Sequence, residues 1–351
     1  MQTAHIHLAA TLLAATAAVG VLGDEAVFEC VISSKSSSLG YSGDTYAPFP
    51  AVIVGDFHPT NNPSGTLTRL GVSGGSGNQQ ISGIGSLSIG GETSAAPSGS
   101  FRLLVDFQNL TVSIEDFVLD FFGGVPAQLG AQVMLFTPST FHTIAPSSVF
   151  IGGSQPPMQV GSAVANSLVI SQTSAAQGAF LVEKDDNVFG FSIPLEASYA
   201  LSLTALGQSV RSGEPIAGTM PLDGTLVFGE GGMLSISFEV AHAETFLQPL
   251  GIAPFASFPV ELPTVLPPGQ SAGLLITGGA PTIEVSMGLS GSIVASGTLE
   301  EREGDVDQDQ VVGVDDLTLV LSSWGLSGPT DLDQNGTTDA IDLALVLHNW
   351  G

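Results

Sequence analysis

Two stretches near the end of the chain carry aspartates at the spacing of a calcium-binding loop. In the first, positions 1, 3, 5 and 12 of a twelve-residue loop are Asp305, Asp307, Asp309 and Asp316. Position 7 is Val311, whose backbone carbonyl would complete the ligand set. A calcium ion takes about six to eight oxygen ligands, and loops of this type supply them from these positions. The spacing therefore predicts a calcium site.

The second stretch repeats the pattern. Its positions 1, 3, 5, 7, 9 and 12 are Asp331, Asp333, Asn335, Thr337, Asp339 and Asp342, with Thr337 offering its carbonyl. Gly336 stands at position 6, where the loop turns sharply, whereas the first loop has Gln310 there. A residue with a side chain adopts that backbone conformation at a cost. We therefore expect two calcium ions, with the first site the weaker one.

Each loop leads into an apolar pattern at helical spacing, i, i+3, i+4 and i+7. The two sets are Leu317, Val320, Leu321 and Trp324, and Leu343, Val346, Leu347 and Trp350. Neither short helix could bury such a stripe alone, so we expect the two to pack on each other. An acidic, solvated tail would not repeat aspartate, leucine and tryptophan positions in step.

The segments GDVDQDQVVGVDDLTLVLSSWG and TDLDQNGTTDAIDLALVLHNWG resemble the two halves of a type I dockerin module. The resemblance covers about residues 304–351. It implies an extracellular module that folds around two calcium ions and docks onto a cohesin domain, often in an assembly that degrades polysaccharide. The partner-reading positions of that family, loop positions 10 and 11, correspond to Val314, Asp315, Ala340 and Ile341. The family commonly has a Ser-Thr type pair there, so the partner is either a cohesin-like protein or the chain's own β-domain.

The other end of the chain has the pattern of an export signal. Residues 8–21 are apolar apart from threonines, and the small residue Gly23 precedes Asp24. The stretch is too short to span a bilayer comfortably. It departs from the usual signal peptide in one respect, because residues 1–7 contain no Lys or Arg. We predict a cleaved signal peptide at 1–23, a secreted or cell-surface location, and no membrane span in the mature chain. Cys30 is the single cysteine, so no internal disulfide is expected.

The charge excludes one class of partner. The formal net charge is -27, from 33 acids and 6 bases. Nucleic acid is not an expected partner, because phosphate binding needs a clustered basic surface.

Residues 24–299 alternate between apolar and polar side chains, which is typical of half-buried strands. Clear examples are 101–107, 110–115 and 234–240, with shorter runs at 51–54, 65–72, 199–206, 224–228, 273–277 and 283–287. Without a sustained helical stripe, this region is predicted to be an antiparallel β-sandwich or barrel of one or two subdomains. A charged hinge at 300–303 separates it from the small α-helical, dockerin-like module at 304–351.

Catalytic patterns are weak in the β-rich region. The acids are scattered, and the adjacent pairs Glu115-Asp116 and Asp185-Asp186 face opposite sides of a strand. His58, His142 and His242 lack zinc-site spacing. The G-x-S-x-G spellings around Ser73 and Ser271 lack the following helix that a nucleophile elbow needs.

Three hypotheses follow. The favoured one is a secreted, non-catalytic β-domain carrying a calcium-dependent docking module for protein–protein assembly. The alternative is a polysaccharide-degrading enzyme of glycoside hydrolase type, or a carbohydrate-binding component of a cellulosome-like assembly. An outer-membrane barrel is a third hypothesis, which the calcium module at the end of the chain disfavours.

Overall fold

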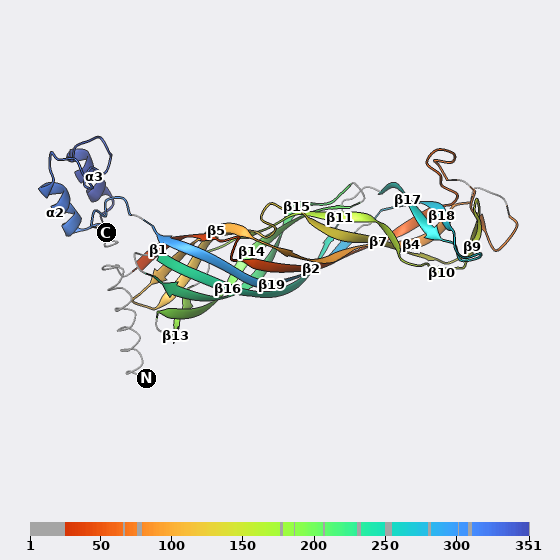
Figure 1. The fold of residues 1–351 in the computed structure, drawn as a ribbon, viewed down its shortest axis with the longest axis horizontal. Coiled ribbons are helices and arrows are strands. Elements are labelled where there is room, and N and C mark those ends of the chain that lie inside the picture. Colours follow the sequence, from red (N-terminus) through yellow and green to blue (C-terminus); the bar gives the residue numbers. More distant parts are fainter. Residues whose placement is uncertain are drawn as a thin grey trace.

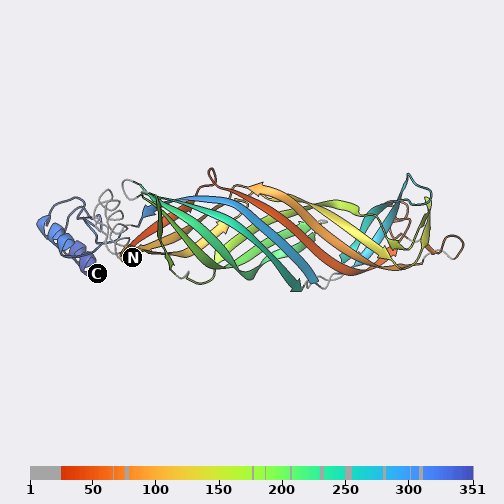
Figure 2. The same ribbon diagram turned by 90° about the horizontal axis from the view of Figure 1, so that it is seen from below.

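The structure is a computed structural model that describes residues 25–65, 67–75, 79–175, 178–185, 187–205, 208–229, 233–249, 255–279, 282–300, 302–307 and 311–350. The predicted signal peptide and Asp309, Gln310 and Glu301 lie outside these residues. The molecule is long and narrow, and its strands run obliquely along the long axis (Figures 1 and 2). The two helices lie beyond one end of the sheet, on the side of β1 (Glu25–Ile32).

The remaining strands follow in chain order. They are β2 Ser38–Val54, β3 Arg69–Leu70, β4 Ile81–Ala95, β5 Ser98–Asp106, β6 Thr111–Asp120, β7 Ala127–Thr137, β8 Phe141–Ile144, β9 Ser147–Phe150, β10 Gly153–Ser154, β11 Met158–Gln172, β12 Ala179–Phe180, β13 Val182–Asp185, β14 Val188–Ala205, β15 Gln208–Phe228, β16 Met233–Pro249, β17 Phe255–Pro263, β18 Ser271–Gly278 and β19 Thr282–Leu299. The helices are α2, Val314–Ser322, and α3, Ala340–His348.

Within the described residues, all but three of these strands form one 16-stranded sheet, and its strands pair antiparallel. The strand order is β12-β6-β5-β1-β19-β16-β15-β14-β11-β7-β4-β2-β18-β17. Two further pairings, β6 with β11 and β19 with β2, bring distant members of this order together. The sheet therefore closes on itself and does not form two separate layers.

Two long strands, β19 and β11, each pair along one side with two different strands. The first half of β19 pairs with β2 and its second half pairs with β1. In the same way, β11 pairs first with β7 and then with β6. The strands β1 and β2 thus run in line along one neighbour, as do β7 and β6, which explains the elongated shape (Figure 2).

The inner face of the closed sheet forms one hydrophobic core. In β7, the side chains alternate strictly between buried and exposed along all of its residues. Phenylalanines fill the end near β1, where the Phe101 ring lies 5.7 Å from the Phe117 ring and 5.5 Å from the Phe238 ring. Burial of these alternate residues supplies the main driving force for folding of this region.

The sequence prediction of a mainly β, antiparallel region is confirmed. Phe101, Leu103 and Val105 are buried as their alternation predicts. The run at 65–72 is the main difference, because only Arg69 and Leu70 form a strand there. That strand belongs to a small separate sheet with β8 and β9, at the end of the molecule far from the helices.

The helical region has a small core of its own. Val312, Val320 and Val346 are buried together, so the two helices pack on each other as predicted. The buried apolar stripe of each helix is narrower than the sequence predicts, however. Leu321 and Leu347 are 52% and 54% exposed, because each helix has only its neighbour to pack on. The tryptophans, which follow the last turns of the helices, are 48% and 45% exposed.

Candidate metal centre

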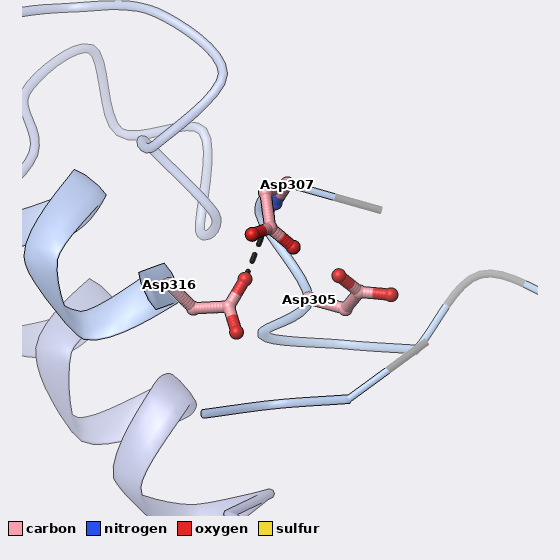
Figure 3. Close-up of side chains that lie close together, drawn as sticks. All are labelled: Asp305, Asp307 and Asp316. Atoms are coloured by element: carbon pink, nitrogen blue, oxygen red, sulfur yellow. Dashed lines mark hydrogen bonds between the residues drawn. The ribbon is translucent and has the colours of Figure 1, made fainter. Parts of the chain in front are cut away.

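Three aspartates of the first loop point toward one another (Figure 3). Each of Asp305, Asp307 and Asp316 offers a carboxylate oxygen, and these oxygens all lie within 4.8 Å of one another. Asp307 is exposed and Asp305 is half-buried, whereas Asp316 is buried at 1% exposure in the first turn of α2. The group therefore opens to solvent on one side and is anchored to a helix on the other.

Backbone donors fix the orientation of Asp316. Its Oδ1 accepts hydrogen bonds from the amides of Val306, at 2.6 Å, and Asp307, at 3.2 Å. Its Oδ2 accepts one from the amide of Gly313, at 2.7 Å. A carboxylate held by three N–H groups ties the start of the loop to the start of the helix, which shapes the loop around the site.

The second loop repeats this arrangement. Oxygens of Asp331, Asp333 and Asp342 also lie within 4.8 Å of one another. Asp342 accepts from Leu332 N at 2.6 Å, from Asp333 N at 3.2 Å and from Asp339 N at 2.7 Å. The residues before the two helices, Gly313 and Asp339, share the same backbone angles, φ -142° and ψ -157°.

The turn of the second loop is held by its own first aspartate. Asp331 accepts the amides of Asn335, at 3.0 Å, and Gly336, at 2.8 Å. Gly336 has φ 99°, which glycine adopts without strain, and Gln334 has φ 55°. The glycine at position 6 therefore has the conformational role that its place in the loop predicts.

Three carboxyl groups lie close together at each of the two sites. Burial opposes ionisation of Asp342, but the N–H groups of Asp339, Asp333 and Leu332 outweigh it and hold the pKa of this carboxyl below its ordinary value. Asp342 is therefore anionic at neutral pH beside two further carboxyl groups. Oxygen-only ligands with such charge suit a hard divalent cation such as calcium.

Three other predicted ligands, Thr337, Val311 and Asp339, lie outside the two aspartate triads. Thr337 is exposed, and its amide donates to Asn335 Oδ1 at 3.0 Å. Val311 is 41% exposed. Asp339 lies at the N-terminus of α3, where its Oδ1 accepts the amide of Ile341 at 2.8 Å. This helix-capping role was missed in the sequence, although an aspartate before an apolar helical run is a common capping pattern.

The four residues predicted to contact a partner lie at the surface. Val314 is 66% exposed and Ile341 is 53% exposed, and both stand in the first turns of their helices. Asp315 and Ala340 are also exposed. These side chains therefore lie outside the small core of the module.

Among the described residues of the β-rich region, the scattered acids and histidines do not form such a group. In the described residues, the two aspartate triads are the clusters in which three potential metal ligands meet. His142 contacts the Gly71 carbonyl at 2.9 Å, and His242 contacts Glu244 at 3.0 Å. Ser271 donates to Glu261 at 3.0 Å on the neighbouring strand, and the element that follows its own strand is the strand β19, not a helix.

Among the described residues, no helix has the length and apolar character needed to cross a membrane. No protein-family model matches the chain, and no characterised protein matches its sequence.

Solved secretin structures show a distant likeness. The secretin InvG of the Salmonella SPI-1 type III secretion injectisome is 8% identical, with a TM-score of 0.20 over 79% of this chain and 65% of that chain. The type IV competence pilus secretin PilQ of V. cholerae is 9% identical, with a TM-score of 0.17 over 79% and 61%. The chain thus spans slightly less than two thirds of these secretins. TM-scores this low do not establish a shared fold.

Proposed function

We propose that this chain is a secreted β-protein whose C-terminal module, residues 304–351, binds two calcium ions and docks the protein onto a partner. The observation that carries the proposal is the pair of aspartate triads in two separate loops, in each of which the carboxylate oxygens lie within 4.8 Å of one another. The resemblance of both segments to a type I dockerin supports a cohesin-like partner, and the chain's own β-domain is the other candidate.

The small core of the module explains why calcium would be needed. Val312, Val320 and Val346 are its buried apolar residues, and a core of this size contributes little to stability. The triads add mutual repulsion of their carboxylates as long as no cation neutralises them. Calcium binding would remove that repulsion and tie each loop to its helix, so binding and folding are coupled.

The surface of the module supports a docking role. Val314 and Ile341 expose apolar side chains in equivalent turns of the two helices, at the ends nearest the aspartate triads. Exposed apolar groups near a rigid loop form a suitable centre for a protein contact. Calcium would control this contact by fixing the loops that hold it.

Tryptophan fluorescence tests the proposal in the intact protein. Trp324 and Trp350 are the only tryptophans, and both belong to the module. We expect calcium to shift the emission spectrum and EDTA to reverse the shift. Calorimetry should give about two ions per chain, with dissociation constants on the order of 10⁻⁶ to 10⁻³ M. An unchanged spectrum and no heat of binding at millimolar calcium would contradict the proposal.

A matched control separates site binding from general ion effects. The β-domain pair Asp223→Asn and Glu239→Gln removes two carboxylates outside the module and should leave the calcium response unchanged. The pair Asp305→Ala and Asp331→Ala removes one ligand from each triad and should abolish the response.

A further inference from the structure

We propose that one open strand edge of the β-domain, residues 241–247 of β16, binds an extended peptide segment that carries basic side chains. A peptide in this position adds a strand to the sheet, so its main chain supplies affinity and its side chains supply selectivity. We call these residues the β16 edge. The edge lies outside the calcium module, so the inference goes beyond the proposed docking function and does not depend on it.

β16 has a neighbouring strand on both sides over only part of its length. β19 pairs with it from Met233 to Pro249, whereas β15 pairs with it only from Leu234 to Glu239. Beyond Glu239, the described residues place no strand on the β15 side of β16. The closed sheet is therefore open between β15 and β16 along this stretch.

The hydrogen-bond register shows which groups of β16 face the opening. The Gly229 amide donates to the Met233 carbonyl at 2.8 Å, so Met233 directs its peptide groups toward β15. In an antiparallel pair, every second residue does the same. The residues that continue this phase beyond the last pair are Ala241, Ala243, Thr245 and Leu247. All four are exposed, and their N–H and C=O groups can pair with an added strand.

The facing edge of β15 is poorly suited to an added strand. In the same phase, the residues of β15 that face the opening are Pro215, Ala217, Thr219 and Pro221. Proline has no N–H to donate and is typical of strand edges that do not pair. The β16 edge has no proline. An added strand therefore pairs with β16 and not with β15.

A buried hydroxyl without a partner lies on the inner side of the opening. Tyr199 of β14 is 1% exposed, and among the described residues its hydroxyl has no hydrogen-bond partner. Its ring stacks on His242 of β16 at 5.9 Å, and His242 Nε2 lies 3.0 Å from Glu244 Oε2. A Cβ at Gly218 of β15 would lie 2.8 Å from the Tyr199 ring and 2.7 Å from the Glu244 carboxylate. The tyrosine and the carboxylate therefore lie together just inside the β16 edge.

The outer side of the β16 edge is hollowed and acidic. A groove with a volume of about 660 Å³ is lined by residues of β16, β19, β2 and β4, including two of the β16 edge. The charged residues that line it are Asp44, Glu92 and Glu244. The last paired residues of β15 and β16, Asp223 and Glu239, are exposed and add two carboxyl groups where the edge begins. Carboxylates thus flank the edge on both of its sides.

These charges favour a basic peptide. The carboxylates repel an acidic segment, whereas lysine or arginine side chains offset them. Successive residues of a strand face opposite sides, so neighbouring basic residues can reach the inner carboxylate and the outer ones. An inner lysine can donate both to Glu244 and to the Tyr199 hydroxyl, which removes the cost of a buried polar group without a partner.

The test uses the full chain in calcium at physiological ionic strength. The probe is a fluorescently labelled nonapeptide, Thr-Lys-Lys-Val-Thr-Lys-Lys-Val-Thr, and fluorescence anisotropy measures its binding. One control peptide has every main-chain amide methylated, so it keeps the charge but cannot donate to a strand. A second has glutamate in place of lysine. We expect saturable binding of the probe, and binding about tenfold or more weaker for each control peptide.

Variants of the protein locate the site. Ala243→Pro removes one donor of the β16 edge, and Glu244→Gln removes the inner carboxylate. Each should weaken binding about tenfold or more. Ala243→Ser keeps the N–H group, and Glu261→Gln removes an exposed carboxylate of β17 outside the edge and the groove, so both should leave binding unchanged. Residue 243 donates to no neighbouring strand, so the proline variant should fold, which circular dichroism checks.

Four results would overturn the proposal. The first is the absence of saturable probe binding to the folded wild-type chain. The second is equally tight binding of the methylated peptide, which would show that charge alone attracts the probe. The third is binding that neither Ala243→Pro nor Glu244→Gln weakens. The fourth is a wild-type dimer in analytical ultracentrifugation that Ala243→Pro dissociates, because the occupant would then be a second copy. If Ala243→Pro does not fold, the methylated peptide and Glu244→Gln decide the outcome.

Discussion

Asp316 and Asp342 hold equivalent positions in two separate loops. Each carboxylate accepts backbone N–H groups from the residues ten, nine and three positions before it, at 2.6, 3.2 and 2.7 Å. An equivalent buried carboxylate thus closes each loop and belongs to each triad.

This equivalence predicts a structural cost for losing the charge. Asp342→Asn places an amide where three N–H donors converge, so at least one donor loses its partner. We expect the module in saturating calcium to lose at least about 1–3 kcal/mol of stability, measured by urea unfolding followed by tryptophan fluorescence. Asp333→Asn is the control, because Asp333 is exposed and should cost much less. Equal losses would show that the three hydrogen bonds do not stabilise the loop.

The two calcium sites should differ. Asp331 lies in the loop with Gly336 at the turn and accepts two amides of that turn, whereas the first loop has Gln310 at the equivalent position. We expect Asp331→Ala to weaken calcium binding more than Asp305→Ala in calorimetric titrations. A larger loss at Asp305 would mean that Gln310 is no handicap to the first loop.

The exposed first turns should carry the partner contact. Replacing Ala340 by Ser and Ile341 by Lys changes surface residues, so calcium-dependent helicity should be preserved. Circular dichroism of the module from Glu303 onward, with calcium and with EDTA, measures the helicity. Pull-down of a cell-surface partner by the full chain should be lost. If the double variant fails to fold with calcium, these residues belong to the core and the docking face lies elsewhere.

Alkaline pH should destabilise the β-domain. Burial, together with the nearby Glu29 charge, raises the pKa of Cys30 from 9.0 to about 12, and burial with Asp44 raises that of Tyr41 from 10.0 to about 12. Because both folded-state pKa values are raised, their contribution is fully present below pH 9 and is lost as the pH rises toward 12. Urea midpoints should fall over this range, and less steeply in Cys30→Ala. A midpoint independent of pH would contradict the prediction.

The phenylalanine core should dominate the stability of the β-domain. Phe101 is 1% exposed and contacts Phe117 and Phe238. Phe101→Ala should therefore cost about 3–5 kcal/mol in urea unfolding. Phe136→Ala removes a half-exposed ring and should cost far less. Similar costs would mean that the core relaxes around the lost ring.

Local patterns in the sequence predicted which aspartates lie together and the strand character of the long region. The aspartates of each triad lie within twelve residues, and over that length the backbone geometry decides which side chains can meet. Alternation works similarly, because successive strand residues face opposite sides wherever the strand lies.

The tertiary structure decided which distant residues become neighbours. Closure of the sheet depends on β19 meeting both β1 and β2, which lie at the other end of the β-rich sequence. Strand register likewise places Asp223 of β15 opposite Glu239 of β16, which no local spacing encodes. The tertiary structure also decided the exposure of Leu321 and Leu347, because a helix buries only the part of its apolar stripe that a neighbour covers.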